Sequence, residues 1–307
     1  MNKKIYANDI INFFELDIIN KDIKLNNFEI FYPTIKRLGL ELATKTGSER
    51  IAHNVVAWGT TESKWFESIG TQKTKEILEH IFGFYPPLVL LSKGVSKENI
   101  VLIKEIASKY KIPVSHSQQF SSSIIVTSIG TYLNSHFAQL IQVHGSLVLV
   151  GGTGVLIVGE SGSGKSEAAL ELIQRGHIFI SDDAVLIKDL GNHFIGSSPK
   201  ITKDLLEVRG IGAIDIKYTY GTRAVASSSV INLVVELVNK EKQNQLDRIG
   251  IEFLKYPIFG RSIKKIQIPI KEGGSAAVLI EAAVNAYLAR HDGLNVIEKM
   301  KRRLNDE

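Results

Sequence analysis

The chain has 307 residues, of which 44% are hydrophobic and 22% are charged. This composition excludes a disordered protein, because the apolar fraction is large enough to offset the entropy lost on folding. The length suits about two domains. A count of 37 Lys and Arg against 32 Asp and Glu gives a formal charge of +5. That charge permits nucleic-acid binding without arguing for it, and we expect no nucleic-acid partner.

The chain contains no cysteine. Disulfides, thiolate zinc sites and thiol catalysis are therefore excluded, which fits the cytoplasmic location that we expect. Near the N-terminus, Asp9, Glu15 and Asp17 interrupt the apolar stretch that a signal peptide needs. The longest apolar run, from Ser146 to Val158, is broken by glycines. It is also shorter than the roughly 20 residues that span a bilayer, so we expect no membrane partner.

The first third of the chain alternates strand-like and helix-like segments. Residues 88–91 form a short apolar run typical of a buried strand, and residues 96–111 show helical periodicity after Ser96, a plausible N-cap. A second strand is predicted to begin at Ile112, and a second helix to cover residues 120–138. The strand-helix-strand order predicts an α/β domain with parallel strands, over residues 1–134, whose role the sequence leaves uncertain.

A second α/β domain is predicted over residues 135–307. It begins with two apolar strands, Leu140 to Val150 and Val155 to Val158. The second strand leads directly into the pattern G-x-x-x-x-G-K-S, formed by Gly159, Glu160, Ser161, Gly162, Ser163, Gly164, Lys165 and Ser166. Glycines at such a turn let backbone N–H groups surround a phosphate chain. We expect Lys165 to reach the β- and γ-phosphates and the Ser166 hydroxyl to ligate Mg²⁺.

A helix is predicted to follow the phosphate loop. Ala169, Leu172 and Ile173 have the spacing of one apolar helix face, and Gly176 stands where a helix often ends. The strand-loop-helix order makes this the most specific motif in the chain, because the N-terminus of a helix attracts anions.

Two adjacent carboxylates, Asp182 and Asp183, come directly after the next apolar run, Ile178 to Ile180. Ligands of open α/β sheets bind beyond the carboxyl ends of the strands, so we expect both residues beside the phosphate loop. One could steady Mg²⁺ through water, and the other could accept a proton from an attacking hydroxyl. Neighbours on an extended chain point to opposite sides, so we expect them to differ in role. A simple turn is the alternative.

A signalling GTPase is disfavoured. The nearest match to the base-reading motif N-K-x-D is Asn239-Lys240-Glu241-Lys242, which has lysine in place of the aspartate.

Several blocks, in order and at matching spacing, closely resemble the HPr kinase/phosphorylase family. One is the family's signature segment, here Leu206, Glu207, Val208, Arg209, Gly210, Ile211, Gly212, Ala213, Ile214 and Asp215. The other blocks are Val143-His144-Gly145, the phosphate loop, Arg175-Gly176-His177, Asp182-Asp183 and Leu246-Asp247-Arg248-Ile249-Gly250. The resemblance covers roughly residues 143–289 closely and the N-terminal region more diffusely.

The resemblance implies an α/β protein of two domains with a C-terminal P-loop kinase domain. It implies a bacterial enzyme that uses ATP or pyrophosphate to phosphorylate a serine of HPr, the phosphocarrier of the sugar phosphotransferase system. The same enzyme removes this phosphate with inorganic phosphate, releasing pyrophosphate. Family members form homo-hexamers and regulate carbon metabolism.

The family's site residues carry over to matching positions. The implied catalytic residues are His144, Lys165, Asp183 and Arg248, with Asp182 the second candidate for the proton acceptor. The implied Mg²⁺ ligands are Ser166 and Glu207, and the loop from Gly159 to Ser166 is implied to hold the nucleotide.

One departure from the family pattern concerns a loop associated with dephosphorylation, usually Pro-Val-Arg-Pro-Gly-Arg-Asn-like. Here it consists of Pro269, Ile270, Lys271, Glu272, Gly273 and Gly274, followed by Ser275. The first arginine is replaced by Lys271 and the second by Gly274. An ammonium cannot reproduce the planar fork of a guanidinium, so we expect weakened phosphorolysis relative to kinase activity.

Two other functions stay open from the sequence. One is a small-molecule phosphotransferase of the phosphoenolpyruvate-carboxykinase type, which uses a similar loop but would need further metal ligands. The other is a nucleotide-binding regulator without chemistry, in which Asp182, Asp183 and Arg248 would be incidental.

Overall fold

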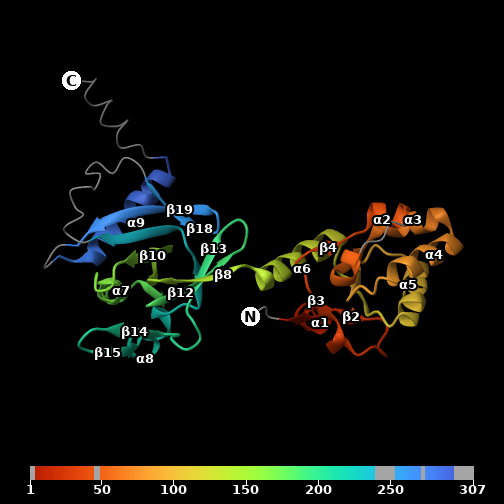
Figure 1. The fold of residues 1–307 in the computed structure, drawn as a ribbon, viewed down its shortest axis with the longest axis horizontal. Helices are drawn as coiled ribbons and strands as arrows, with labels where there is room; N and C mark the ends of the chain where they lie inside the picture. The colour runs from red at the N-terminus through yellow and green to blue at the C-terminus, as the bar shows by residue number, and fades with distance from the viewer. Residues whose placement is uncertain (1–3, 45–48, 239–252, 271–273, 294–307) are drawn as a thin grey trace, which may run out of the picture. The chain divides into compact units, whose positions relative to one another are not determined.

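The computed structural model describes residues 4–44, 49–238, 253–270 and 274–293. The chain divides into two compact units, residues 1–138 and 139–307. The mixed α/β class predicted from the sequence is confirmed (Figure 1). Within the described ranges, every helix is too short or too polar to cross a bilayer.

The N-terminal unit is built around a five-stranded sheet of order β2-β7-β6-β5-β4, in which only the edge strand β2 runs antiparallel. A separate two-stranded sheet pairs β1 with β3. The strands of the whole unit are β1 (Ile5–Tyr6), β2 (Asp17–Ile18), β3 (Glu29–Ile30), β4 (Ile35–Lys36), β5 (Val55–Trp58), β6 (Val89–Leu91) and β7 (Val114–His116). Its helices are α1 (Ala7–Phe13), α2 (Gly39–Thr44), α3 (Thr60–Ile69), α4 (Thr71–Phe82), α5 (Lys97–Lys109) and α6 (Ser122–Phe137), with short 3₁₀ turns at Leu25–Asn27 and Glu49–His53.

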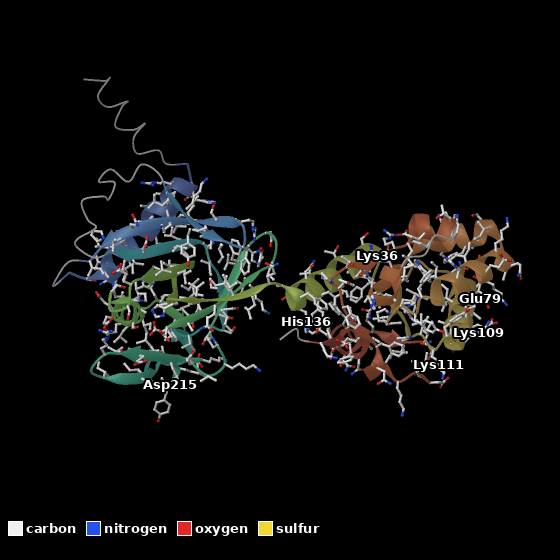
Figure 2. All side chains as sticks on the ribbon, viewed as in Figure 1. Lys36, Glu79, Lys109, Lys111, His136 and Asp215 are labelled. Carbon is white, nitrogen blue, oxygen red and sulfur yellow. The ribbon has the colours of Figure 1, made fainter. Side chains whose placement is uncertain are left out.

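Alternation along β5 explains why helices cover both faces of this sheet. Val56 and Trp58 pack with α3, α4 and α5, whereas Val55 and Ala57 pack with α1 and α6. On the outer surface, Lys109 of α5 donates a hydrogen bond of 2.8 Å to Glu79 of α4 (Figure 2). The parallel pair β6 and β7, with α5 between them in the chain, confirms the predicted strand-helix-strand unit.

Both predicted helices of this unit are confirmed. The hydroxyl of Ser96 accepts the N–H of Asn99 and caps α5. In the same way Ser121 accepts the N–H of Ile124 at the start of α6. Each cap satisfies one of the backbone donors that a helix N-terminus leaves without a partner.

The C-terminal unit has three layers. Its strands are β8 (Leu140–His144), β9 (Ser146–Val150), β10 (Thr153–Gly159), β11 (Ile178–Ser181), β12 (Ala184–Asp189), β13 (Phe194–Ser197), β14 (Leu205–Val208), β15 (Gly212–Asp215), β16 (Ser228–Val230), β17 (Leu233–Val238), β18 (Leu254–Ile258) and β19 (Arg261–Pro269). Its helices are α7 (Lys165–Gln174), α8 (Ile216–Tyr220) and α9 (Ala276–His291), with a 3₁₀ turn at Thr222–Ala224.

The central layer is a six-stranded sheet of order β11-β9-β10-β17-β19-β18. Helices α7 and α9 pack on one face with Val155, Ile157 and Leu237. The other face meets a four-stranded sheet of order β16-β13-β12-β8 through residues such as Leu156 and Val185. Strands β10, β17 and β19 are parallel, so their carboxyl ends meet at one edge.

The prediction of a single strand from Leu140 to Val150 is wrong. The chain is divided at Gly145 into β8 and β9, which belong to different sheets. A Cβ atom at Gly145 would lie 2.6 Å from the carbonyl oxygen of Ile157, so the crossing requires glycine.

The helix predicted after the phosphate loop is confirmed as α7. Its predicted apolar face is buried, with Ala169, Leu172 and Ile173 at most 4% exposed. Its end is a Schellman motif: the N–H of His177 binds the carbonyl of Leu172, the N–H of Gly176 binds that of Ile173, and Gly176 has φ +92°.

The C-terminus of α7 is tied to α9 by hydrogen bonds from Arg175 and His177 to Glu281. The guanidinium of Arg175 donates to both oxygens of Glu281 at 2.9 and 2.6 Å, and Nε2 of His177 lies 2.8 Å from Oε1. The hydrogen bonds from Arg175 and then His177 lower the pKa of Glu281 from 4.5 to about 2. The folded state therefore gains stability from this carboxylate above pH 4.5 and loses it as the pH falls toward 2.

We predict that Glu281→Gln lowers the melting temperature at pH 7 by about 2–4 °C, as expected for a bidentate pair worth about 1 kcal/mol. The difference from wild type should shrink as the pH falls from 4.5 toward 2, because the unfolded wild-type chain takes up a proton at Glu281 in this range while the folded chain keeps the carboxylate charged. Thermal unfolding of the full chain at several pH values measures both effects. Glu105→Gln is the control, because its exposed partner Lys75 lies 3.7 Å away. A difference that does not depend on pH would contradict the linkage.

Candidate active site

The phosphate loop leaves the carboxyl end of β10 and enters the first turn of α7. Gly162 and Gly164 have φ angles of +80° and +81°, in the left-handed region that favours glycine. At Gly159, a Cβ atom would lie 2.7 Å from Oγ of Ser163 and 2.8 Å from the carbonyl oxygen of Leu237. A side chain at Gly159 would therefore displace the loop or the neighbouring strand.

Lys165 is the first residue of α7 and is only 7% exposed. Its Nζ donates to the carbonyl oxygens of Gly159 and Glu160 at 3.2 and 3.0 Å. These bonds hold the ammonium group inside the loop, where the N-terminal end of α7 also carries positive partial charge. The buried Oγ of Ser163 has no hydrogen-bond partner among the described residues.

Asp182 is a buried carboxylate, 3% exposed, directly after β11. The hydroxyl of Ser146 donates to Oδ1 at 2.5 Å, and the backbone N–H of Glu207 donates to Oδ2 at 3.4 Å. Both oxygens of Asp182 are therefore engaged, which fixes the orientation of the carboxylate.

Asp183 has the opposite environment, with a side chain that is 69% exposed. The N–H of Ala184 binds the carbonyl of Asp182 at 2.7 Å across Asp183, whose φ is +64°. This is the hydrogen bond of a γ-turn, a strained conformation for a residue other than glycine. The surroundings of the two carboxylates differ. The expectation of an extended chain at these two residues is wrong, because the chain turns at Asp183.

His144 lies beside Asp183. Its Nδ1 is 2.9 Å from the carbonyl oxygen of Asp183 and 3.1 Å from Oδ1. A carbonyl oxygen can only accept, so the hydrogen bond places a proton on Nδ1. The imidazole therefore faces Asp183 as a donor.

The signature segment forms a hairpin of β14 and β15 beside the phosphate loop. Leu206 and Val208 are buried, so the alternation of β14 turns Glu207 outward. Arg209 follows at the turn, and its guanidinium lies 3.5 Å from the position of a Cβ on Gly162. The hairpin thus supplies a carboxylate and a guanidinium to the phosphate loop.

These elements meet around one pocket of 170 Å³. Lys165, Ser166 and other residues of the phosphate loop line it together with His144, Asp182, Asp183, Glu207 and Arg209. The sequence-predicted residues from four separate segments are therefore brought together. Arg248 and residues 271–273 lie outside the described residues. Pro269, Ile270 and Gly274 line a different pocket.

Sequence reasoning missed Ser146 and gave Arg209 no role of its own. Ser146 is a single hydroxyl before the apolar run Leu147–Val150, and it is completely buried. A hydroxyl at the start of an apolar strand is expected to be buried, and a buried hydroxyl usually has a hydrogen-bond partner. The sequence therefore contained a signal that Ser146 holds another polar group. No comparable signal identifies Arg209, because its place depends on how the hairpin folds.

A strand, phosphate loop and helix, with acidic residues after the next strand along the chain, define a P-loop phosphotransferase. The family model described as HPr Serine kinase N terminus matches residues 5–133, and that described as HPr Serine kinase C-terminal domain matches residues 135–304. The chain therefore belongs to the HPr kinase/phosphorylase family.

Two relatives match this chain over nearly its whole length. The chain is 47% identical over 310 residues to HPr kinase/phosphorylase of Mycoplasmopsis pulmonis, covering 100% of both chains. It is 31% identical over 297 residues to that of Mycoplasma pneumoniae, covering 95% of this chain and 93% of the relative. The solved HPr(Ser) kinase/phosphatase of Coxiella burnetii is 31% identical, with a TM-score of 0.48 over 54% of this chain and 99% of that chain.

We predict that Ser146→Ala lowers the melting temperature by a few degrees, because a buried carboxylate loses a hydrogen bond worth about 1–3 kcal/mol. In an Asp182→Asn background the same substitution should have a clearly smaller effect, since the charged acceptor is gone. Thermal unfolding of the two single variants and the double variant measures this coupling. Ser115→Ala is the control, because its buried hydroxyl donates to the carbonyl of Asp17 instead. Additive effects of Ser146→Ala and Asp182→Asn would contradict the pairing.

Proposed function

We propose that this chain phosphorylates a serine of HPr with ATP or pyrophosphate and catalyses the reverse phosphorolysis of phosphoseryl-HPr. The observation that carries the proposal is the meeting of Lys165, Asp183 and His144 at one pocket of the phosphate loop. Family membership supplies the protein substrate. Inorganic phosphate and pyrophosphate are the second substrate and product of the reverse reaction.

The phosphate chain of the donor binds in the loop from Gly159 to Ser166. Backbone N–H groups there and the N-terminal end of α7 favour an anion. Lys165 and Arg209 both line the pocket. In this proposal Lys165 contacts the β- and γ-phosphates, and Arg209 adds a second positive charge from the hairpin. The role assigned to Arg248 rests on the sequence resemblance.

A bound Mg²⁺ would be held by the hydroxyl of Ser166 and the carboxylate of Glu207, which line the same pocket. No cluster of three acidic or histidine side chains suited to a metal occurs among the described residues. The pair of Ser166 and Glu207 still fits Mg²⁺, because this ion is commonly held by one or two carboxylates together with substrate phosphates. When bound, the ion would neutralise charge on the transferred phosphoryl group.

Asp183 is the proton acceptor in this proposal. Asp182 is buried with both oxygens hydrogen-bonded, whereas Asp183 is exposed to an incoming serine. In the kinase direction, the bond from the serine Oγ to phosphorus forms as the bond to the donor's leaving oxygen breaks. The serine proton passes to Asp183. His144 orients Asp183 through its Nδ1 hydrogen bond.

The reverse reaction uses the same groups. An oxygen of inorganic phosphate attacks the phosphoserine phosphorus, so that a P–O–P bond forms and the bond to the serine Oγ breaks. Asp183 returns its proton to that oxygen, and pyrophosphate leaves. One set of residues can therefore serve both directions.

Assembly into a homo-hexamer and a cytoplasmic location are also proposed. Both rest on membership of the family.

We predict that wild-type protein with ATP, Mg²⁺ and purified HPr produces phosphoserine detectable by mass spectrometry. Asp183→Asn should slow the transfer about 10²–10⁴-fold, because the proton acceptor is lost, while ATP binding changes little. Asp292→Asn, in an exposed position after α9, is the matched control. If the wild type forms no phosphoserine, the assignment of HPr as the substrate is refuted. If Asp183→Asn is fully active, the assignment of Asp183 as the proton acceptor is refuted. ATP binding by the wild type and by Asp183→Asn, with no phosphoryl transfer from either, would indicate a nucleotide-binding regulator without chemistry.

A second prediction concerns the loop at residues 269–275, where lysine and glycine replace two arginines of the family pattern. We expect phosphorolysis to be weak relative to kinase activity. The double substitution Lys271→Arg and Gly274→Arg should raise the ratio of phosphorolysis to phosphorylation, because two guanidinium groups can bind phosphate bidentately. Initial rates in both directions on purified protein measure this ratio. Comparable wild-type rates in the two directions would contradict the prediction.

A further inference from the structure

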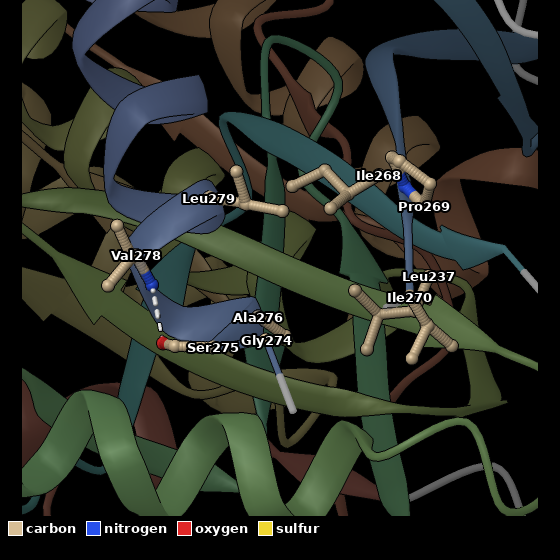
Figure 3. Close-up of a pocket in the computed structure, with 9 residues that line it drawn as sticks. All are labelled: Leu237, Ile268, Pro269, Ile270, Gly274, Ser275, Ala276, Val278 and Leu279. Carbon is tan, nitrogen blue, oxygen red and sulfur yellow. Dashed lines mark hydrogen bonds between the residues drawn. The ribbon is translucent and has the colours of Figure 1, made fainter. Parts of the chain in front are cut away.

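A second pocket of the C-terminal unit lies at the same sheet edge as the phosphate loop. It has a volume of 320 Å³ and is enclosed by the carboxyl ends of β17 and β19 and the first turn of α9 (Figure 3). Leu237, Ile268, Ile270 and Leu279 form its apolar walls. This edge is where parallel α/β sheets bind ligands.

The pocket is continuous with the phosphate loop through Leu237. Leu237 is paired in the sheet with Gly159, the first residue of the loop. Its carbonyl oxygen and Cβ lie 2.8 and 3.4 Å from the position of a Cβ on Gly159. Strands β10 and β19 flank β17, so the pocket lies within about two strand spacings, ~10 Å, of the loop.

The pocket also lies on the same face of the sheet as the helix that follows the loop. Leu237 and Ile268 share a core cluster with Ala168 and Leu172 of α7. At the rim, the hydroxyl of Ser275 donates to Glu171 of α7 at 2.5 Å. A ligand whose phosphates lie at the N-terminus of α7 can therefore extend into this pocket without crossing the sheet.

The chemistry of the walls suits an apolar or weakly polar group. Ser275 supplies the single polar side chain among the described lining residues, and its hydroxyl is already bonded to Glu171 and to the N–H of Val278. Val278 and Leu279 remain 45% and 41% exposed. Covering such apolar surface with an aromatic ring is favourable, and small-molecule sites are typically about 300–1,000 Å³.

We propose that this pocket receives the nucleobase of the nucleoside triphosphate donor. The inference rests on the proposed function, since it assigns a second part of the same donor. It has one distinctive consequence: ATP engages both the loop and the pocket, whereas pyrophosphate, which has no base, engages the loop alone.

The test compares the two donors in a variant that shortens a pocket wall. Leu279→Ala should raise the KM for ATP about five- to tenfold, because apolar contact with the base is lost, while the KM for pyrophosphate stays within about twofold. Leu288→Ala is the matched control: Leu288 lies on the same helix, is 39% exposed and does not line the pocket. Ala276→Phe, which fills the pocket, should weaken ATP use further and again spare pyrophosphate.

Calorimetric binding of ADP and of pyrophosphate to the full chain separates this inference from the proposed function. Weaker ADP binding by Leu279→Ala with unchanged pyrophosphate binding supports the base pocket, even if no HPr phosphorylation is seen. Equal losses for both ligands, or no loss for either, would overturn it. Circular-dichroism melting curves of each variant identify any loss of folding. The ADP and pyrophosphate affinities of Leu288→Ala are the reference values against which those of Leu279→Ala are compared.

Discussion

Two segments of the chain cross from one sheet to another at the same place, and the candidate active site depends on this crossing. At residues 144–146 the chain passes from β8, in the four-stranded sheet, to β9, in the six-stranded sheet. Residues 181–184 make the reverse passage from β11 to β12. The two passages are joined by the N–H of Gly145, which binds the carbonyl of Asp183 at 3.2 Å. Gly145 itself has no room for a side chain.

The crossing explains why adjacent residues have different environments. Ser146 lies on the six-stranded side and holds the buried Asp182, whereas His144 lies on the four-stranded side and contacts the exposed Asp183. A buried carboxylate needs hydrogen bonds to offset the loss of solvation, and Asp182 has them. Asp183 instead occupies a strained turn that leaves its oxygens accessible. One carboxylate is thereby held by hydrogen bonds and the other is left exposed.

Much of this could be predicted from the sequence, where the signal is local. The phosphate loop, the apolar face of α7 and the glycine at its end all follow from short-range spacing. The division at Gly145 could not, because a run of apolar residues looks the same whether it lies in one sheet or in two. The surroundings of Asp182 and Asp183 likewise depend on Ser146 and His144, which come from a distant segment. The apolar pocket beside Leu237 is formed where β17, β19 and the start of α9 meet, which depends on the strand order of the sheet.

The hydrogen bonds of Lys165 have a consequence for ligand affinity. Its ammonium group is shared between two carbonyl oxygens of its own loop, at Gly159 and Glu160. Any incoming phosphate oxygen must compete with these internal acceptors, so the gain on binding is the difference between two sets of contacts. An affinity calculated only from the attraction between Lys165 and a small anion would therefore be too high. A long polyanion, with several oxygens along the loop, can displace both carbonyls at once and has the advantage over a single phosphate.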